Sequence, residues 1–198
     1  MDTTLQYYND NTDSYVSDTC DVDFSKTQNH FLNLLPPNAC ILDFGCGSGR
    51  DAKWFSDHGY QVDATDGSAE MCKAAAAYTG LHVKQMLFRE LSSVERYDGI
   101  WACASILHLP KEELRIVMGK MAAALKSRGI IYCSFKYGTF EGMRRGRYFT
   151  DFTEDTFQEF MKNIGLLEIE EQWVTSDVRS GRECEKWLNN IIRKSEHH

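Results

Sequence analysis

Short apolar runs alternate with longer segments of helical periodicity through the middle of the chain. The runs that predict strands are 40–44, 61–65, 82–86, 99–102 and 130–135. The segments that predict helices are 51–58, 69–78 and 111–126, the last with apolar side chains at helical spacing. This alternation is typical of βαβ units, in which parallel strands form one sheet and helices cover both of its faces.

The N-terminal segment differs because polar residues there are interleaved with Tyr7, Tyr8 and Tyr15. So many rings are unusual for a solvated tail, and they predict either a helical lid or a helix docked onto the core. The two readings are compatible, and both stay open. A helix over 26–35 follows, and the two prolines after it are expected to end it.

The regular alternation ends after residue 135. Residues 136–148 are rich in Gly and Arg and predict a long loop, and 153–164 predict a helix capped by a threonine. The runs 166–174 and 186–192 have no helix between them, so they predict an antiparallel hairpin. We therefore expect one domain over 1–198, with a helical lid segment at 1–35 and an α/β core at 36–198. The expected core is a Rossmann-like, doubly wound, mostly parallel seven-stranded sheet with a C-terminal antiparallel hairpin.

The first predicted strand ends in Asp43, and glycines then occupy every second position at Gly45, Gly47 and Gly49. Glycine-rich backbone between a strand and a helix lets a ligand lie against the main chain, although a tight turn without a ligand also fits. Asp43 would repel a phosphate and attract a cationic group. The spacing also differs from the G-x-G-x-x-G pattern of dinucleotide enzymes, which tells against an NAD-linked reductase.

Two further stretches are expected to reach the same crevice. The second strand ends near Asp66, about 20 residues after the glycines, where a nucleotide-binding βαβ unit places its ribose-binding carboxylate. Residues 97–109 end another strand and open a loop toward this edge of the sheet.

Composition and net charge limit the classes of binding partner that the chain is expected to have. The 198 residues are 42% apolar and 26% charged, which is typical of a globular protein, and no apolar run is long enough to cross a bilayer. A net charge of −7 disfavours nucleic acid, so a small-molecule partner is preferred. The first residues show no secretory signal, and a cytoplasmic monomer or homodimer is expected. The seven cysteines form no C-x-x-C pair, which indicates free thiols rather than metal ligands. His197 and His198 are interpreted as part of a tag. No metal site is therefore expected.

The motifs ILDFGCGSGRDA, VDATDGSAEM and YDGIWACASILHL, in that order, resemble those of class I S-adenosylmethionine-dependent methyltransferases. The C-terminal stretches FKYGTFEGMRRGRYFTDFTEDTF and WVTSDVRSGRECEKWLN are similar to small bacterial methyltransferases related to tellurite resistance. The resemblance implies S-adenosylmethionine as cofactor and S-adenosylhomocysteine as product.

The resemblance also implies roles for individual residues. Asp43 would hold the cofactor's amino group, the three glycines would approach its methionine end, and Asp66 would bind both ribose hydroxyls. Met71 would pack near the adenine. The family often has an acid after the third strand, but Leu87 and Phe88 stand there, so backbone groups, apolar packing or Glu90 would hold the adenine. The other positions assigned to the cofactor are Arg50, Gly67, Ser68 and Ala102.

Methyl transfer needs alignment, and it needs a general base only where the acceptor must lose a proton. His108 is the candidate base, although it could equally cap the next helix. Tyr8 and Tyr15 are expected to close over the acceptor.

The chain's basic concentration lies in its C-terminal third. Lys136, Arg147 and Arg179 are expected to bind an anionic acceptor, whereas Arg144 and Arg145 read as a solvated loop. A protein that binds S-adenosylmethionine or another nucleoside without turnover, as a sensor or partner, is the alternative function.

Overall fold

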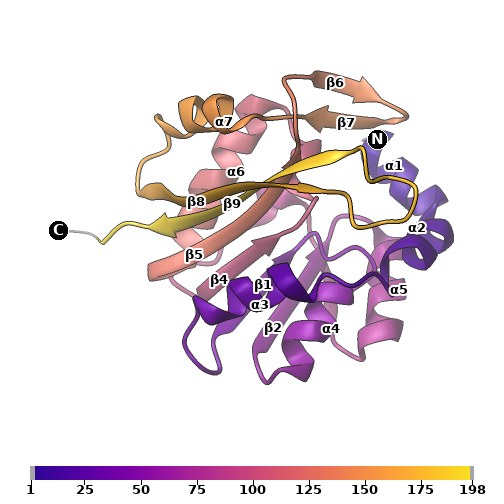
Figure 1. Ribbon diagram of the computed structural model, residues 1–198. Coiled ribbons are helices and arrows are strands. Elements are labelled where there is room, and N and C mark those ends of the chain that lie inside the picture. The colour runs from indigo at the N-terminus through magenta and orange to yellow at the C-terminus, as the bar shows by residue number, and fades with distance from the viewer. Residues whose placement is uncertain (1–2, 197–198) are drawn as a thin grey trace.

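A seven-stranded sheet forms the centre of the molecule, in the order β3-β2-β1-β4-β5-β9-β8 (Figure 1). The structure is a computed structural model that describes residues 3–196, so the ends of the predicted domain, with His197 and His198, lie outside the described residues. The strands of this sheet are β1 (Cys40–Phe44), β2 (Gln61–Asp66), β3 (Val83–Gln85), β4 (Tyr97–Ala102), β5 (Leu125–Lys136), β8 (Leu167–Ser176) and β9 (Lys186–Lys194). The first five are parallel, while β9 runs antiparallel to both β5 and β8.

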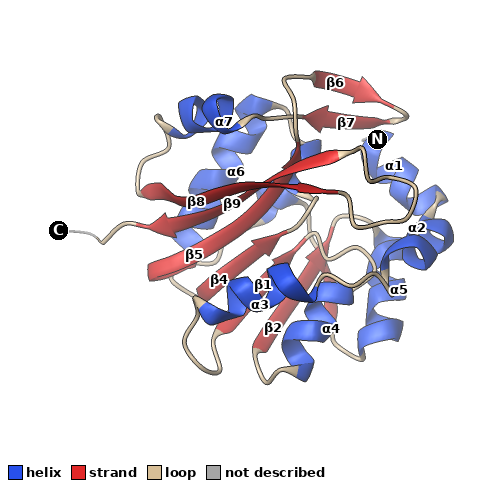
Figure 2. Ribbon diagram, in the orientation of Figure 1, coloured by secondary structure: helices blue, strands red, loops and turns tan. Residues whose placement is uncertain are grey.

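The helices surround this sheet (Figure 2). They are α1 (Thr3–Asp10), α2 (Thr12–Thr19), α3 (Ser25–Asn33), α4 (Arg50–Asp57), α5 (Ala69–Thr79), α6 (Lys111–Ala124) and α7 (Glu154–Met161), with short 3₁₀ turns at Phe88–Glu90 and Ile106–His108. The predicted α/β class, the parallel strands and the C-terminal antiparallel pair are confirmed. Helix α3 ends at Asn33, before the prolines, and α6 ends at Ala124 because Leu125 already pairs with Tyr97 in the sheet.

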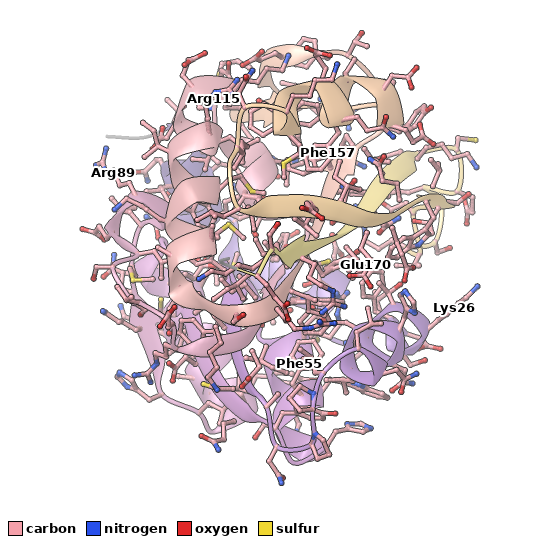
Figure 3. The ribbon with its side chains drawn as sticks, turned by 90° about the vertical axis from the view of Figure 1, so that its left-hand side faces the viewer. Lys26, Phe55, Arg89, Arg115, Phe157 and Glu170 are labelled. Carbon is pink, nitrogen blue, oxygen red and sulfur yellow. The ribbon has the colours of Figure 1, made fainter. Side chains whose placement is uncertain are left out.

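Strand alternation divides the core into two layers. In β1, Ile41 packs with Phe31 of α3 and Phe55 of α4, whereas Leu42 faces the layer that contains α6 and α7. Figure 3 shows Phe55 and Phe157 of α7 in the interior, and Lys26 pointing outward. Burial on both sides explains why the central strands are continuous apolar runs.

The predicted loop over 136–148 is wrong, because β6 (Glu141–Arg144) and β7 (Arg147–Thr150) form an antiparallel hairpin. Its two-residue connection is Arg145-Gly146, with φ of 51° and 79°. Positive φ at both positions is typical of a type I′ turn, but Arg-Gly lacks the Asn or Asp that usually signals one.

The N-terminal helices lie beside the carboxyl edge of the sheet, against α5 and β7 (Figure 1). Over residues 3–196, no helix is both long and apolar enough to span a membrane.

Candidate active site

The glycine loop joins β1 to α4 at the carboxyl edge of the sheet. The backbone N–H groups of Gly45 and Cys46 both donate to the Thr65 carbonyl, at 2.9 Å, which ties the loop to β2. Gly45 has φ of 86°, and a Cβ there would lie 2.5 Å from the Ser105 Cβ. A Cβ on Gly47 would lie 3.1 Å from the Tyr15 ring, a tight contact, and its φ of 53° also favours glycine. Gly49 instead packs against α5, where a Cβ would lie 2.7 Å from Thr79.

Asp43 lies at the base of this loop and is buried. Its Oδ2 has no hydrogen-bond partner among the described residues. Burial raises the pKa of its carboxyl well above the usual value, the carboxylates of Asp51 and Asp66 add to this, and Arg50 opposes it. A buried acceptor without a partner fits a ligand that brings a cationic donor, which is what the amino group of S-adenosylmethionine supplies.

Asp66, at the end of β2, is held by backbone donors. Its carboxylate accepts from the N–H of Gly47 at 3.0 Å and of Ser68 at 2.9 Å, while burial raises its pKa. Ser68 caps α5 by accepting from the N–H of Met71, which is itself buried. These residues form a hydrogen-bonded edge directly beside the glycine loop.

Helix α1 covers the segment predicted to hold the adenosine. A Cβ on Gly67 would lie 2.8 Å from a methyl of Leu5 and 3.3 Å from one of Leu87. Asn9, also on α1, accepts a hydrogen bond of 2.6 Å from the Ser68 hydroxyl. The N-terminal segment therefore closes over the predicted cofactor residues as well as over the acceptor side.

The residues after β3 form a short turn. Phe88 packs edge-on against Phe44, with ring centroids 4.8 Å apart, and Glu90 accepts from the Leu87 N–H at 2.7 Å. Since its carboxylate closes its own turn, Glu90 is a weaker candidate for the adenine than Leu87 and Phe88. Ala102 is buried at the end of β4.

A cavity of about 570 Å³ opens beside the glycine loop. Of the predicted residues, its wall contains Tyr8, Tyr15, Gly45, Arg50, His108, Lys136, Arg147 and Arg179. Among the described residues that line it, eight are Lys or Arg and four are Asp or Glu, although the whole chain has 22 basic and 29 acidic residues. The wall thus carries a surplus of positive charge in an acidic protein, which favours an anionic occupant.

A hydrogen-bonded row crosses one side of this cavity. His108 Nδ1 lies 2.6 Å from the Tyr148 carbonyl, so Nδ1 carries the proton and Nε2 is the acceptor. The Tyr8 hydroxyl donates to that Nε2 at 2.8 Å, and it accepts from Arg147 at 3.4 Å. Burial raises the pKa of Tyr8, so the phenol stays protonated. His108 is therefore part of the cavity wall, and its Nε2 is bonded to Tyr8, which lines the same cavity.

Arg147 is the half-buried cation of this row. Its guanidinium stacks on Tyr7 at 4.4 Å and on Phe149 at 5.2 Å rather than pairing with a carboxylate of the described chain, and its Nε has no hydrogen-bond partner there. A half-buried guanidinium that no described carboxylate neutralises is suited to bind an anion.

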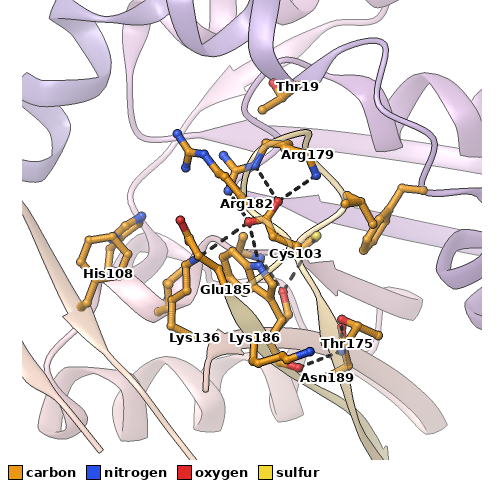
Figure 4. A pocket seen from close by; sticks show the side chains of 18 of the residues that line it. Thr19, Cys103, His108, Lys136, Thr175, Arg179, Arg182, Glu185, Lys186 and Asn189 are labelled. Carbon is orange, nitrogen blue, oxygen red and sulfur yellow. Dashed lines mark hydrogen bonds and ion pairs between the residues drawn. The ribbon is translucent and has the colours of Figure 1, made fainter. Parts of the chain in front are cut away.

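The other two predicted cations already have carboxylate partners. Arg179 forms a two-pronged pair with Asp177, at 2.6 and 2.9 Å, and Lys136 pairs with Glu185 and lies 3.6 Å from Asp177. Figure 4 shows Glu185 next to Lys136 and Arg179, with His108 standing apart from them. Arg144 also differs from its prediction as part of a solvated loop, because it pairs with the buried Asp151, whereas Arg145 is exposed.

Asp51, a buried carboxylate on the cavity wall, was not among the residues predicted from the sequence. It accepts from Gln28, Arg50 and Trp101, at 2.7 to 2.8 Å, and so joins α3, α4 and β4. Asp177 and Glu185 were also missed. Their alternation with Arg179 and Arg182 along the chain was the available signal.

Residues 41–129 match the family model described as a methyltransferase domain. A search of the curated proteins found no match to this sequence.

Solved structures share the fold at low identity. A Burkholderia thailandensis 1,6-didemethyltoxoflavin-N1-methyltransferase, with bound 1,6-didemethyltoxoflavin and S-adenosylhomocysteine, is 20% identical, with a TM-score of 0.76 over 97% of this chain and 85% of that one. A putative sarcosine dimethylglycine methyltransferase from Galdieria sulphuraria is 17% identical, with a TM-score of 0.66 over 86% of both chains. The [4+2]-cyclase SpnF is 16% identical, with a TM-score of 0.73 over 97% of this chain and 95% of that one.

The sheet order is that of the class I methyltransferase fold, and the domain match covers the strands that build the glycine loop and the Asp66 edge. The chain thus has the fold of class I methyltransferases and, over residues 41–129, matches a methyltransferase domain. Activity and acceptor are separate questions, because one fold supports several chemistries.

Proposed function

We propose that the protein transfers the methyl group of S-adenosylmethionine to a small anionic acceptor bound in the cavity beside the glycine loop. The observation that carries this proposal is Arg147, a half-buried guanidinium on the cavity wall that no described carboxylate neutralises. The surplus of cationic side chains in the same wall supports it.

Asp43 would bind the amino group of the cofactor, and Asp66 its ribose, at the edge formed by Gly45 and Gly47. The sulfonium supplies an activated methyl group, so the protein's main contribution is alignment and exclusion of water. Tyr8 and Tyr15 close the cavity from the N-terminal side. Where the acceptor carries a proton, Tyr8 would take it and pass its own to His108 Nε2.

The acceptor class includes carboxylates and oxyanions. The similarity of the C-terminal motifs to tellurite-related methyltransferases makes metalloid oxyanions one group within this class. A cytoplasmic site of action is part of the proposal, and the seven free cysteines support it.

The direct test has two stages. Calorimetry should detect binding of S-adenosylmethionine, and release of S-adenosylhomocysteine should then appear with some members of a panel of carboxylates and metalloid oxyanions. Binding without release across that panel would favour the non-catalytic sensor or partner role.

Reversing the charge at Arg147 tests the acceptor site. We expect Arg147→Glu to raise the KM for the acceptor at least about tenfold, because a charged hydrogen bond is lost and a repulsion is added. The Kd for S-adenosylmethionine should change much less. Arg145→Glu is the matched control, since Arg145 is exposed on the same hairpin. Equal effects of Arg147→Glu on acceptor and cofactor would contradict the assignment.

A further inference from the structure

Lys136 lies on the cavity wall, but its ammonium is already paired with a carboxylate of the same chain. Its ammonium pairs with Glu185 and sits 4.0 Å from the centre of the Trp187 ring. The Lys136 ammonium lowers the pKa of Glu185, so this side chain is an anion at neutral pH. A cation at the end of β5, with a ring beneath it, thus already forms a binding place for one carboxylate.

The two carboxylates near Lys136 are held very differently. The Asp177 side chain is 2% exposed and accepts from the backbone and guanidinium of Arg179 and from the Trp187 indole. The Glu185 side chain is 39% exposed and lines the cavity. Removing Asp177 from its donors would break a buried network, whereas Glu185 can exchange its ammonium partner for water at small cost.

The backbone around Glu185 is fixed independently of its side chain. The Glu185 N–H donates to the Arg182 carbonyl, and the Asp177 N–H donates to the Glu185 carbonyl, each at 2.8 Å. Exchange at Lys136 therefore requires rotation of one side chain and leaves the connection between β8 and β9 in place.

We propose that a ligand carboxylate or similar oxyanion binds to the Lys136 ammonium by displacing Glu185, which occupies that position in the free protein. Glu185 acts as an internal competitor that sets how strongly an anion must bind before it enters the site. This inference rests on the proposed function for the identity of the ligand as the methyl acceptor, but anion exchange itself does not require methyl transfer.

The test uses acetate and sulfate as separate probes, titrated into the full chain and followed through the Trp187 indole N–H signal in NMR spectra. That group lies beneath Lys136 and donates to Asp177, so it reports on charge at this place. We expect Glu185→Gln to tighten binding of at least one probe about fivefold, which is the upper range for a partly exposed ion pair. A gain for acetate alone assigns a carboxylate, and a gain for both assigns oxyanions generally.

Two variants make the result specific. Glu183→Gln is the matched control, because Glu183 is an exposed acid of the same connection that accepts from the Gly181 N–H. It should leave both affinities unchanged. In Lys136→Met/Glu185→Gln the gain should disappear, and melting curves of each variant check that it is folded.

Glu185→Gln without tighter binding, or with a gain that persists when Lys136 is replaced, would overturn the inference. The outcomes separate from those of the proposed function. Anion exchange without release of S-adenosylhomocysteine would support the role of Glu185 and contradict the proposed methyl transfer. Turnover without anion exchange would support methyl transfer and contradict the role of Glu185.

Discussion

At the scale of single residues, Asp43 combines a cost in stability with the proposed contact to the cofactor. A buried carboxyl with an unpartnered Oδ2 and a raised pKa destabilises the free protein at neutral pH, because folding removes an ionised group from water. The same carboxyl is positioned to bind a cationic amino group. We therefore expect stability and cofactor binding to respond in opposite directions when it is changed.

Asp43→Asn should stabilise the protein without cofactor, and the gain should grow with pH. The folded pKa lies above the unfolded value of about 3.9, so the wild type loses stability as pH rises from there toward the folded pKa. Each pH unit between the two pKa values changes the free energy of unfolding by about 1.4 kcal/mol. Urea unfolding between pH 4 and pH 8 measures the difference, with the exposed Asp57→Asn of α4 as control. A difference that does not vary with pH would show that Asp43 is not a buried acid of this kind.

Substitution of Asp43 by alanine tests the proposed contact with the cofactor. Asp43→Ala should abolish binding of S-adenosylmethionine in calorimetry while the melting transition stays cooperative, because the acceptor for the ammonium group is removed and the loop glycines remain. Normal binding by Asp43→Ala would overturn the assignment of this carboxylate.

At the scale of elements, the β6–β7 hairpin positions Arg147 against the N-terminal helix. Gly146 has φ of 79°, and a Cβ there would meet Tyr7 at 3.5 Å, an ordinary contact. The obstacle to a side chain at this turn is therefore the backbone conformation rather than space.

Gly146→Ala should cost about 1–2 kcal/mol of stability through the left-handed backbone, and it should raise the acceptor KM by displacing Arg147. Gly119→Ala, inside α6 where a Cβ meets nothing within 4 Å, should instead stabilise by about 0.5–1 kcal/mol. Thermal unfolding of both variants checks the opposite signs. A neutral Gly146→Ala would mean that the turn adapts without strain.

At the scale of the whole molecule, the two ends of the chain contribute unequally. Strand β9 enters the sheet between β5 and β8 and pairs along both, with Ile191 and Ile192 fully buried. Helices α1 and α2 lie on the outside, over the glycine loop and the end of β2.

Truncation after Glu185 should abolish cooperative unfolding, because it leaves β5 and β8 without their shared partner. Removal of residues 1–20 should leave a cooperative transition at a lower melting temperature and a large loss of turnover, because Tyr8 and Tyr15 no longer close the cavity. Circular dichroism melts and release of S-adenosylhomocysteine measure the two effects. Full turnover without residues 1–20 would exclude a lid.

Local patterns were enough to predict much of this protein. The limits of β1 follow from its apolar run, the parallel strands from alternation with helices, and the glycine loop from the spacing that follows Asp43, because each depends on neighbours along the chain. The match over residues 41–129 covers the same stretch.

Other features depended on contacts between distant segments, which no local pattern contains. The hairpin that carries Arg147, the seat of β9 between β5 and β8, and the carboxylates that neutralise Lys136 and Arg179 were decided by the tertiary structure. The sequence by itself determined the α/β sheet and the glycine loop that follows Asp43. Only the folded chain decided which cation is left without a carboxylate partner, because charge neutralisation depends on side chains that approach through space.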